Sequence, residues 1–477
     1  MEQHQSNSSN PKKKLHMANN QQSQSVAVVM VPMPAQGHLN QLLHLSHRLS
    51  STANLPVYYI GAAIHIRQAK LRLHGWDPSS TPNNINFHEF PTPHFQNPQP
   101  DHHAPTIFPI QIFPSVSATI NNLRAPVFAF VNDLSKMYKK VVVIYDSLMS
   151  YVVQDIDSIT NTELYGFWSL SAITLFFLQW HKMGRPDNLP GEAYSILKQI
   201  PDPDGLFPPE FQTLRASRKI NVSGVIYNSN RVIEGLYLDL LGKGTSKQWA
   251  IGPFNPIQVN NYHSGITRHE CLDWLDKQEL DSVIFVSFGT TTSFSDEQIQ
   301  ELAIGFEKSR QKFIWALREA DKGDIFSGET RKPVLPDGFE GRVKGRGIVV
   351  REWAPQLEIL GHFATGGFMS HCGWNSCMES MSMGVPIATW PVHSDQPVNA
   401  VLVTKSLKIG VEVKSWERRD EVVSSGVVER AVRRLMDSEE GDEMRKRAKE
   451  LRDGMKSGIR NKEMDLFVNH ITSKSKL

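Results

Sequence analysis

The feature that most constrains this sequence is a repeated alternation of short apolar runs with amphipathic helical patterns. The first run, Val26–Val31, is continuous and rich in Val, which is typical of a parallel strand buried on both faces. Pro32 and Pro34 end this run, and a helical pattern with a Leu-rich face follows over 39–49. Strands that alternate with helices in this way predict an α/β fold built on a doubly wound parallel sheet.

The same alternation occurs in both halves of the chain. In the first half, further strands are predicted at 57–60, 141–145 and 163–168. In the second half, a helix is predicted at 296–310, and strands are predicted at 282–288, 313–317, 347–351, 368–371 and 385–389. Ligands of such sheets bind beyond the carboxyl ends of the strands. We therefore expect two nucleotide-binding-type domains that face each other across a cleft.

The boundaries of the domains follow from changes in composition. The segment 252–268 is rich in Pro and Asn and has little periodicity, so we interpret it as a linker. It separates an N-terminal domain at 26–251 from a C-terminal domain at 269–450. The remainder, 451–477, is expected to form a helix that packs back on the N-terminal domain. Residues 1–25 are rich in Ser, Asn and Gln and are expected to be a disordered leader.

The composition argues against several classes of partner. Lys and Arg total 51 against 49 Asp and Glu, so the formal net charge of +2 provides no field for nucleic acid or an anionic membrane. The longest apolar runs have the length of strands, so no stable membrane insertion is expected. Only 3 Cys occur, and the N-terminal segment lacks the apolar core of a secretory signal, which together indicate a reducing, cytoplasmic location. We expect a monomer.

One segment has the arrangement of a diphosphate-binding turn. Residues 371–376 read His-Cys-Gly-Trp-Asn-Ser, follow an apolar strand and precede a helical pattern. The free N–H groups and the dipole at a helix N-terminus favour an anion there, and Gly373 lets the backbone come close to it. We therefore expect His371, Asn375 and Ser376 to bind phosphate groups. The alternative is a well-capped strand-to-helix turn that binds nothing.

Groups suited to the rest of a sugar nucleotide surround this turn. Trp353 follows a predicted strand and offers a planar face for a base. Glu379 lies one turn into the helix, where its carboxylate can accept two ribose hydroxyl protons. Asp395 and Gln396 combine acceptors with a donor, which matches vicinal hydroxyls of a hexose. Asp395 taken alone has the character of a surface acid.

Transfer of a sugar to an alcohol requires a base, and His is the residue whose ordinary pKa suits that role near neutral pH. Of the 18 His, His38 follows the first buried strand at its carboxyl end, where ligands bind. Asp146 ends the strand at 141–145 in the same half, so its carboxylate is expected to fix the tautomer of His38. The alternatives are a capping surface His and a turn-forming Asp.

Other nucleotide-using classes lack their motifs in this chain. No Gly-x-Gly-x-x-Gly follows a predicted strand, which argues against a dinucleotide-dependent oxidoreductase, and the P-loop pattern is absent. Two Asp-x-Asp pairs, at 155–157 and 202–204, resemble metal-binding motifs. Neither follows a strand of the half that carries the diphosphate turn, so we interpret both as loop acids and expect no metal.

Residues 26–470 resemble plant family 1 glycosyltransferases, whose donors are UDP-sugars. The segment 353–396 has the order and spacing of that family's signature box. Within the family, the N-terminal half is most similar to the zeatin O-glycosyltransferases, at 33–42, 58–60, 88–93, 145–149 and 183–186. The resemblance implies a GT-B fold of two facing Rossmann-like doubly wound domains, with acceptors bound by the N-terminal domain and UDP-sugars by the C-terminal one.

The resemblance also implies roles for particular residues. His38 and Asp146 correspond to the family's catalytic base and its partner. The family's donor contacts correspond to Trp353, Ala354, Gln356, His371, Trp374, Asn375, Ser376, Glu379, Asp395 and Gln396, together with Thr290 and Ser169 from other loops. We expect a metal-free displacement with inversion, and no tightly bound cofactor.

The resemblance favours one donor and one acceptor and leaves alternatives for each. A terminal Gln such as Gln396 most often accompanies UDP-glucose in the family, although UDP-xylose users also carry it. The N-terminal similarity favours a zeatin-type cytokinin as acceptor, with flavonoids, other phenols and terpenoids as alternatives. Candidate acceptor-pocket residues are Phe95, Leu148, Trp180 and His393, each of which could equally pack in a core. A non-catalytic UDP-sugar-binding protein is the alternative from another class, but it would not need the His38–Asp146 pair.

Overall fold

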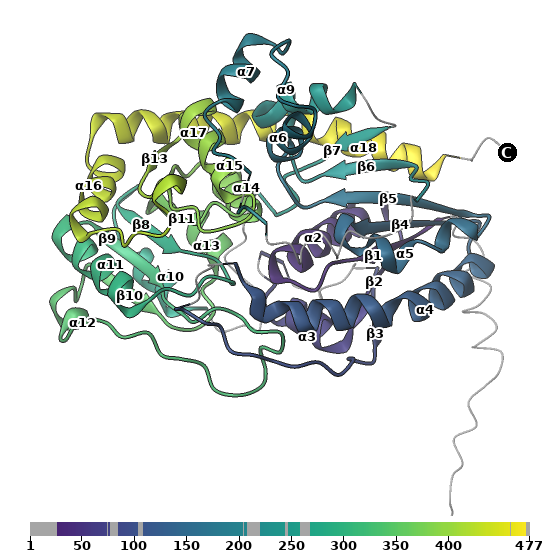
Figure 1. Cartoon of the computed structure of the whole chain (residues 1–477), viewed down its shortest axis with the longest axis horizontal. Coiled ribbons are helices and arrows are strands. Elements are labelled where there is room, and N and C mark those ends of the chain that lie inside the picture. The colour runs from purple at the N-terminus through teal and green to yellow at the C-terminus, as the bar shows by residue number, and fades with distance from the viewer. Residues whose placement is uncertain are drawn as a thin grey trace, which may run out of the picture.

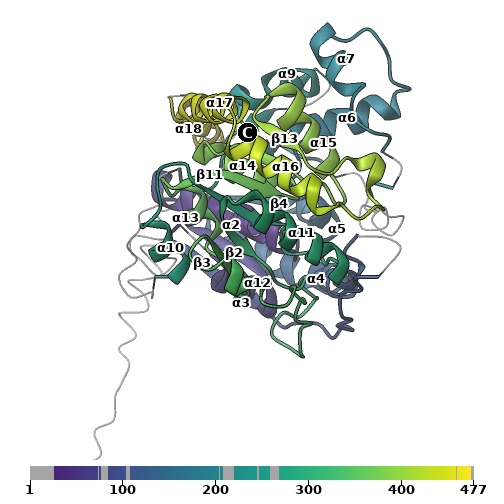
Figure 2. The same ribbon diagram turned by 90° about the vertical axis from the view of Figure 1, so that its left-hand side faces the viewer.

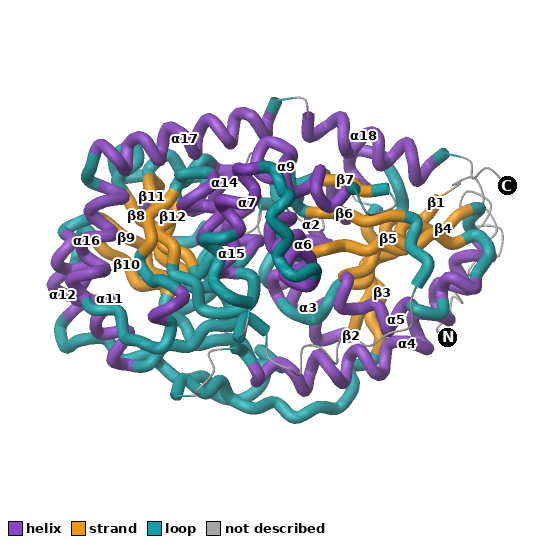
Figure 3. The backbone as a smooth tube through the Cα atoms, turned by 45° about the horizontal axis from the view of Figure 1, so that its top comes forward, coloured by secondary structure: helices purple, strands orange, loops and turns teal. Residues whose placement is uncertain are grey.

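The computed structural model describes residues 26–73, 75–76, 84–103, 108–203, 205–207, 220–243, 247–257, 268–457 and 459–473. These residues form two parallel sheets in two lobes that lie side by side (Figure 1). Helices flank both groups of strands (Figure 3). The predicted α/β fold with two facing doubly wound domains is confirmed. The expected leader and the centre of the expected linker, 258–267, lie outside the described residues.

The N-terminal sheet has the strand order β3-β2-β1-β4-β5-β6-β7, and all of its pairings are parallel. Its strands are β1 (Val26–Val31), β2 (Val57–Ala62), β3 (Ile85–Phe90), β4 (Lys140–Asp146), β5 (Thr162–Trp168), β6 (Gly224–Tyr227) and β7 (Gln248–Ala250). Its helices are α2 (Gln36–Ala53), α3 (Ala63–Leu71), α4 (Phe113–Met137), α5 (Ser150–Val153), α6 (Ala172–Lys182), α7 (Gly191–Leu197) and α9 (Arg231–Gly242). The strand order reverses between β1 and β4, which creates a crevice at their carboxyl ends.

The C-terminal sheet is also wholly parallel, with the order β10-β9-β8-β11-β12-β13. Its strands are β8 (Val283–Ser287), β9 (Lys312–Ala316), β10 (Gly347–Val350), β11 (Thr365–Ser370), β12 (Ile387–Thr389) and β13 (Gly410–Glu412). Its helices are α10 (Glu270–Leu275), α11 (Asp296–Ser309), α12 (Phe339–Arg342), α13 (Gln356–Leu360), α14 (Trp374–Met383), α15 (Gln396–Val401) and α16 (Ser425–Met436). Here the order reverses between β8 and β11. Figure 2 shows α11, α12 and α16 nearest the viewer at the outer end of this lobe.

Strand β1 shows why a continuous apolar run predicts this fold. Successive side chains of a strand point to opposite faces of the sheet. Val28 packs with α2 in one buried cluster, and Val29 packs with α4 in another, so both faces of β1 are covered. Burial on both faces leaves no position for a polar residue, which explains the composition of the run.

The two C-terminal helices connect the lobes. α17 (Glu439–Lys456) packs on α14 of the C-terminal lobe, and α18 (Ile459–Thr472) packs on β7 of the N-terminal lobe (Figure 1, yellow). Phe467 is fully buried there against Tyr165 and Trp249. The chain therefore crosses the lobe boundary twice and returns to the sheet with which it began.

Several elements differ from the sequence prediction. Helix α2 begins at Gln36 instead of residue 39, so His38 lies in the first turn of the helix and not in the loop before it. Four strands were not predicted: β3, β6, β7 and β13. β3 mixes exposed, partly exposed and buried positions without a regular alternation, and the other three strands are no longer than Gly224–Tyr227. Such short or half-exposed strands lack the apolar run that identifies β1.

Candidate active site

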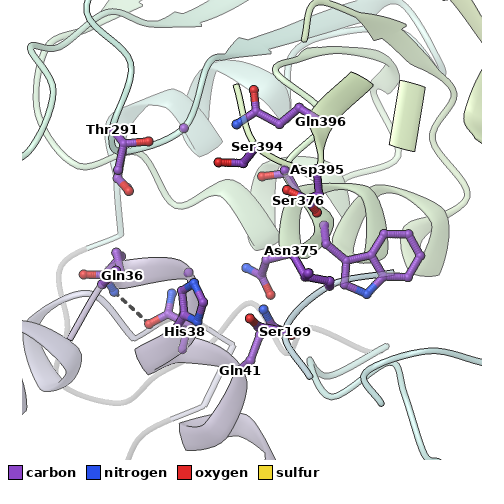
Figure 4. A pocket seen from close by; sticks show the side chains of 18 of the residues that line it. Gln36, His38, Gln41, Ser169, Thr291, Asn375, Ser376, Ser394, Asp395 and Gln396 are labelled. Carbon is purple, nitrogen blue, oxygen red and sulfur yellow. Dashed lines mark hydrogen bonds between the residues drawn. The ribbon is translucent and has the colours of Figure 1, made fainter. Parts of the chain in front are cut away.

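A cavity of about 1000 Å³ lies between the two lobes, at the carboxyl ends of both sheets. In Figure 4, His38 and Gln41 lie across from Asn375 and Asp395 of the C-terminal lobe. All twelve predicted donor residues line this one cavity: Ser169, Thr290, Trp353, Ala354, Gln356, His371, Trp374, Asn375, Ser376, Glu379, Asp395 and Gln396. Because the reversal points of the two sheets face each other, residues far apart in the sequence meet here.

His38 and Asp146 form a hydrogen-bonded pair at the reversal point of the N-terminal sheet. β1 and β4 pair in register, with Val31 opposite Tyr145, so the residues that follow them come together. His38 Nδ1 lies 2.7 Å from Asp146 Oδ2, and the Asp146 side chain is fully buried. Its Oδ1 accepts from the backbone N–H of Leu148 at 3.0 Å. The carboxylate thus holds the proton of His38 on Nδ1 and leaves the Nε2 lone pair available.

The surroundings of His38 favour its protonated form. Burial alone would lower the pKa of His38, but the nearby Asp146 carboxylate, its hydrogen bond and the more distant Asp395 outweigh burial and raise the pKa above its ordinary 6.5. A raised pKa makes Nε2 a stronger base. It also means that the neutral ring becomes scarce as the pH falls below neutrality.

Removing the carboxylate of this pair should change how the reaction rate depends on pH. In Asp146→Asn, burial of His38 is no longer offset by the carboxylate, so the acid limb of the pH–rate profile should move to lower pH. The plateau rate should fall about 100-fold, because the amide does not stabilise the imidazolium. The measurement is kcat/KM for the acceptor as a function of pH, with the UDP-sugar donor at saturation. Exposed Asp157→Asn is the control and should leave both limb and plateau unchanged. An acid limb that moves upward in Asp146→Asn would contradict this assignment.

His371 lies in a tight cradle between two loops of the C-terminal lobe. Cβ atoms added at Gly289 and Gly373 would lie 2.6 Å and 2.5 Å from His371 Nε2, so only glycine permits this approach. Gly289 also has a φ of +79°, which side chains disfavour. Burial lowers the pKa of His371 to about 4, so its ring is neutral and can donate one N–H to an oxyanion.

A network of side chains pre-arranges the start of α14. Glu379 accepts from Gln356 Nε2 at 2.7 Å through one carboxylate oxygen and from Asn375 Nδ2 at 2.9 Å through the other. Gln356 also donates to Ser376 Oγ at 3.1 Å. Four predicted donor residues therefore form one hydrogen-bonded unit on the cavity wall. A carboxylate held on both oxygens in this way is positioned before any ligand arrives.

Asp395 is buried and belongs to a hydrogen-bond network that connects the two lobes. Burial raises the pKa of Asp395 to about 6, against the hydrogen bond from Asn399 Nδ2 at 2.7 Å. Asn399 Nδ2 also donates to Cys372 O at 2.9 Å, and its Oδ1 accepts from Ser171 Oγ of the N-terminal lobe at 2.6 Å. Asn399 was not among the predicted site residues. Its spacing from Asp395 places the two side chains on one helix face, which is the signal that could have revealed it.

Gln396 uses its carbonyl to shape the loop before α15. Its Oε1 accepts from the backbone N–H groups of Val392 at 2.8 Å and His393 at 3.0 Å. His393 Nε2 lies 3.2 Å from Thr291 Oγ1, which connects this loop to the one after β8. Burial lowers the pKa of His393 to about 3, so it is neutral. His393, which was predicted to contact the acceptor, lines the cavity from the C-terminal lobe.

Two predicted donor residues have contacts that the sequence did not reveal. Trp353 carries the Arg72 guanidinium 4.5 Å and the Arg318 guanidinium 5.5 Å from its ring centre. Trp374 is 3% exposed, and its indole N–H donates to Asn228 O in the N-terminal lobe at 2.8 Å. Both tryptophans thus lie where the lobes meet.

The acceptor candidates divide into two groups. Leu148 and His393 line the cavity. Phe95 is outside the lining and lies beside Gly323 of the other lobe, and Trp180 is buried in a core cluster with its indole N–H donating to Pro186 O at 2.8 Å. These two predicted pocket positions are corrected accordingly. Apolar residues that were not predicted also line the cavity: Phe108, Ile112, Leu175, Leu178, Phe207 and Tyr227.

The described part of the chain contains neither a metal-binding cluster nor a membrane-spanning helix. No cluster of three or more His, Cys, Asp or Glu side chains is arranged to hold a metal ion among those residues. Within the same ranges, no helix combines the length and apolar character that crossing a membrane requires.

The two-lobed fold and the cavity define a glycosyltransferase that uses a nucleotide sugar. The glycosyltransferase N-terminal domain family matches residues 24–256, and the UDP-glucoronosyl and UDP-glucosyl transferase family matches 268–445. The chain is 52% identical to zeatin O-glucosyltransferase of Phaseolus lunatus over 94% of this chain and 97% of that protein. It is 50% identical to zeatin O-xylosyltransferase of Phaseolus vulgaris over 94% and 98%.

Solved structures agree with this assignment. Phytolacca americana UGT2, solved with UDP-2-fluoro-glucose and pterostilbene, superposes with a TM-score of 0.72 at 26% identity, over 94% of this chain and 99% of that one. A Polygonum tinctorium UDP-glucosyltransferase superposes with a TM-score of 0.73 at 27% identity over the same shares. The chain belongs to the plant family 1 UDP-glycosyltransferases. It is an enzyme that transfers a sugar from a UDP-sugar to a small plant metabolite.

Proposed function

We propose that this enzyme transfers glucose from UDP-glucose, with inversion, to the hydroxyl group of a zeatin-type cytokinin, with His38 as the base and Asp146 as its partner. The observation that carries the proposal is that His38, held 2.7 Å from buried Asp146, lines the same cavity as the complete donor box. The N-terminal lobe, 26–251, is the acceptor side, and the C-terminal lobe, 269–450, is the donor side. The monomeric state and cytoplasmic location remain predictions.

The chemistry follows from the positions of these groups. His38 Nε2 takes the proton of the acceptor hydroxyl while its oxygen attacks the anomeric carbon of the sugar. The bond from that carbon to the UDP oxygen breaks, and the electron pair leaves with UDP. The N-terminus of α14 and the neutral His371 ring stabilise the charge on the leaving diphosphate. Attack opposite the leaving group inverts an α-linked donor to a β-glycoside.

The zeatin O-glycosyltransferases support a cytokinin acceptor, because the similarity to them extends over nearly the whole chain, including the lobe that would bind it. The apolar wall of the cavity suits a flat, largely apolar acceptor. Flavonoids, other phenols and terpenoids fit that wall in the same general way and are the alternative acceptors. UDP-xylose is the alternative donor, since the similar protein of Phaseolus vulgaris is named for xylose transfer.

A donor-by-acceptor screen tests the proposal. UDP-glucose and UDP-xylose are each mixed with trans-zeatin, cis-zeatin and several flavonoids, with UDP release and product mass as the readouts. We expect the highest kcat/KM for UDP-glucose with a zeatin. Preference for a flavonoid would overturn the acceptor, and preference for UDP-xylose would overturn the donor. Bound UDP without turnover of any acceptor would favour the non-catalytic alternative.

A further inference from the structure

The loop that follows β9 reaches from the C-terminal lobe onto the N-terminal lobe. We call residues 319–329 of this loop the clasp. Asp321 in the clasp forms an ion pair with Arg72, which caps α3: the guanidinium contacts both carboxylate oxygens, one of them at 3.0 Å. Both side chains are buried, at 8% and 9% exposure. Because both charges are shielded from water, removal of either side chain would leave a buried charge without this partner, which would weaken the contact between the lobes.

Further hydrogen bonds hold the clasp along its length. Gln111 donates to Asp321 O at 2.9 Å, and Ser115 donates to Gly323 O at 3.3 Å, both from the N-terminal lobe. Asn97 makes a reciprocal pair: its amide donates to Asp324 O at 3.2 Å, and its carbonyl accepts from Asp324 N at 2.9 Å. Each of these hydrogen bonds joins the two lobes, so all of them would break if the lobes separated.

The clasp is also connected directly to the donor site. The backbone N–H of Asp321 donates to Thr290 O at 2.7 Å, and Arg318 donates to Asp321 Oδ1 at 2.9 Å. Arg72 and Arg318 both lie over the ring of Trp353, at 4.5 Å and 5.5 Å from its centre. Both guanidiniums line the same cavity as Trp353. A residue of the acceptor-side lobe therefore touches the ring assigned to the base of UDP.

We propose that the clasp and Arg72 couple closure of the lobes to donor binding, with Arg72 and Asp321 as positioning residues for the nucleotide through Trp353. This inference rests on the proposed donor role of Trp353. Without the ion pair, the closed arrangement would be a minor species of the ligand-free enzyme. The apparent affinity for UDP is then reduced in proportion to the fraction of the enzyme that is closed. Saturating donor still restores the closed form, because it binds that form preferentially. The expected signature is a raised donor KM with a nearly unchanged kcat.

The test uses the full chain, with UDP itself as the probe in calorimetry and a donor titration in the activity assay. Arg72→Gln and Asp321→Asn should each raise the UDP Kd and the donor KM roughly 10- to 100-fold and change kcat less than about 3-fold. Asn97 contacts the clasp at Asp324, away from Trp353, so Asn97→Ala should raise the UDP Kd and the donor KM by about 3-fold. The matched control is Arg124→Gln, which breaks an Arg–Asp pair inside one lobe and should change neither.

The outcomes separate this inference from the proposed function. If the wild-type chain binds no UDP, the donor site itself is wrongly assigned. If it binds UDP and all three clasp variants bind it equally well, the clasp has no role and the inference is overturned. A fall in kcat with unchanged KM would also overturn it, because that pattern indicates damage to the reacting groups. Melting curves check folding, and Asn97→Ala, at a partly exposed position, keeps the test available if Arg72→Gln does not fold.

Discussion

His38→Ala should lower kcat about 1000-fold while leaving the Kd of UDP within about 2-fold of the wild-type value. General-base catalysis contributes roughly 10²–10⁴-fold to such reactions. This variant removes an imidazole that lines the cavity and is oriented by the buried carboxylate of Asp146 behind it. The donor contacts all come from other elements, so UDP binding should persist. The measurements are initial rates at saturating substrates and calorimetric titration with UDP.

Two further variants make the His38 prediction specific. His38→Gln keeps a polar side chain that can still contact Asp146 but cannot take up a proton, so it should be about as inactive as His38→Ala. His181→Ala, on α6 but outside the cavity lining, should retain wild-type turnover. If His38→Ala retained a tenth or more of the wild-type kcat, another group would have to accept the proton, and the pair with Asp146 would be structural.

The sequence predicted those parts of the fold in which burial alone selects the residues. β1 is covered on both faces, so every residue is apolar and the run is unmistakable. β3 lies at the edge of its sheet with exposed Asn86 and Glu89, so its alternation is too irregular to distinguish from a loop. Edge strands need not be apolar on both faces, and their sequences therefore carry less information.

The donor residues of the C-terminal lobe were predictable for a different reason. They occupy one continuous segment, so their order and spacing can be recognised without knowing how the lobes pack. Arg72 and Asp321 are 249 positions apart, and no local pattern indicates that they meet. Asn399 likewise depends on a partner in the other lobe, Ser171, for its place beside Asp395. Contacts between lobes are set by packing, which local spacing does not encode.

Helix α6 shows why the acceptor pocket was predicted only in part. Its sequence is apolar on most sides, so periodicity does not say which stripe faces the cavity. In the structure Leu175, Leu178 and Lys182 lie on one stripe and line the cavity, whereas Phe176 and Trp180 face the core. The spacing of residues along α6 shows which of them share a helix face. Which face lines the cavity depends on where the other lobe lies, and spacing does not reveal this.

Glu379→Ala should weaken UDP binding about 100-fold or more. A hydrogen bond to a charged group contributes about 1.5–3 kcal/mol, and two ribose hydroxyls can bond to this carboxylate. The variant also releases Gln356 and Asn375, which Glu379 holds at 2.7 Å and 2.9 Å, so the remaining contacts become less ordered. Calorimetry with UDP provides the measurement. Glu352→Ala, an exposed carboxylate beside Trp353, is the matched control and should bind UDP normally.

The ribose assignment can be separated from general damage by removing one ribose hydroxyl from the ligand instead of the protein. The wild-type enzyme should bind 2′-deoxy-UDP about 10-fold more weakly than UDP, since one charged hydrogen bond is lost. Glu379→Ala should bind the two ligands almost equally, because the partner of that hydroxyl is already absent. Such non-additivity is expected of groups that touch each other or share one hydrogen-bond network, and not of groups that act independently. If Glu379→Ala still preferred UDP by the wild-type factor, the carboxylate would act on the α14 network and not on the ribose.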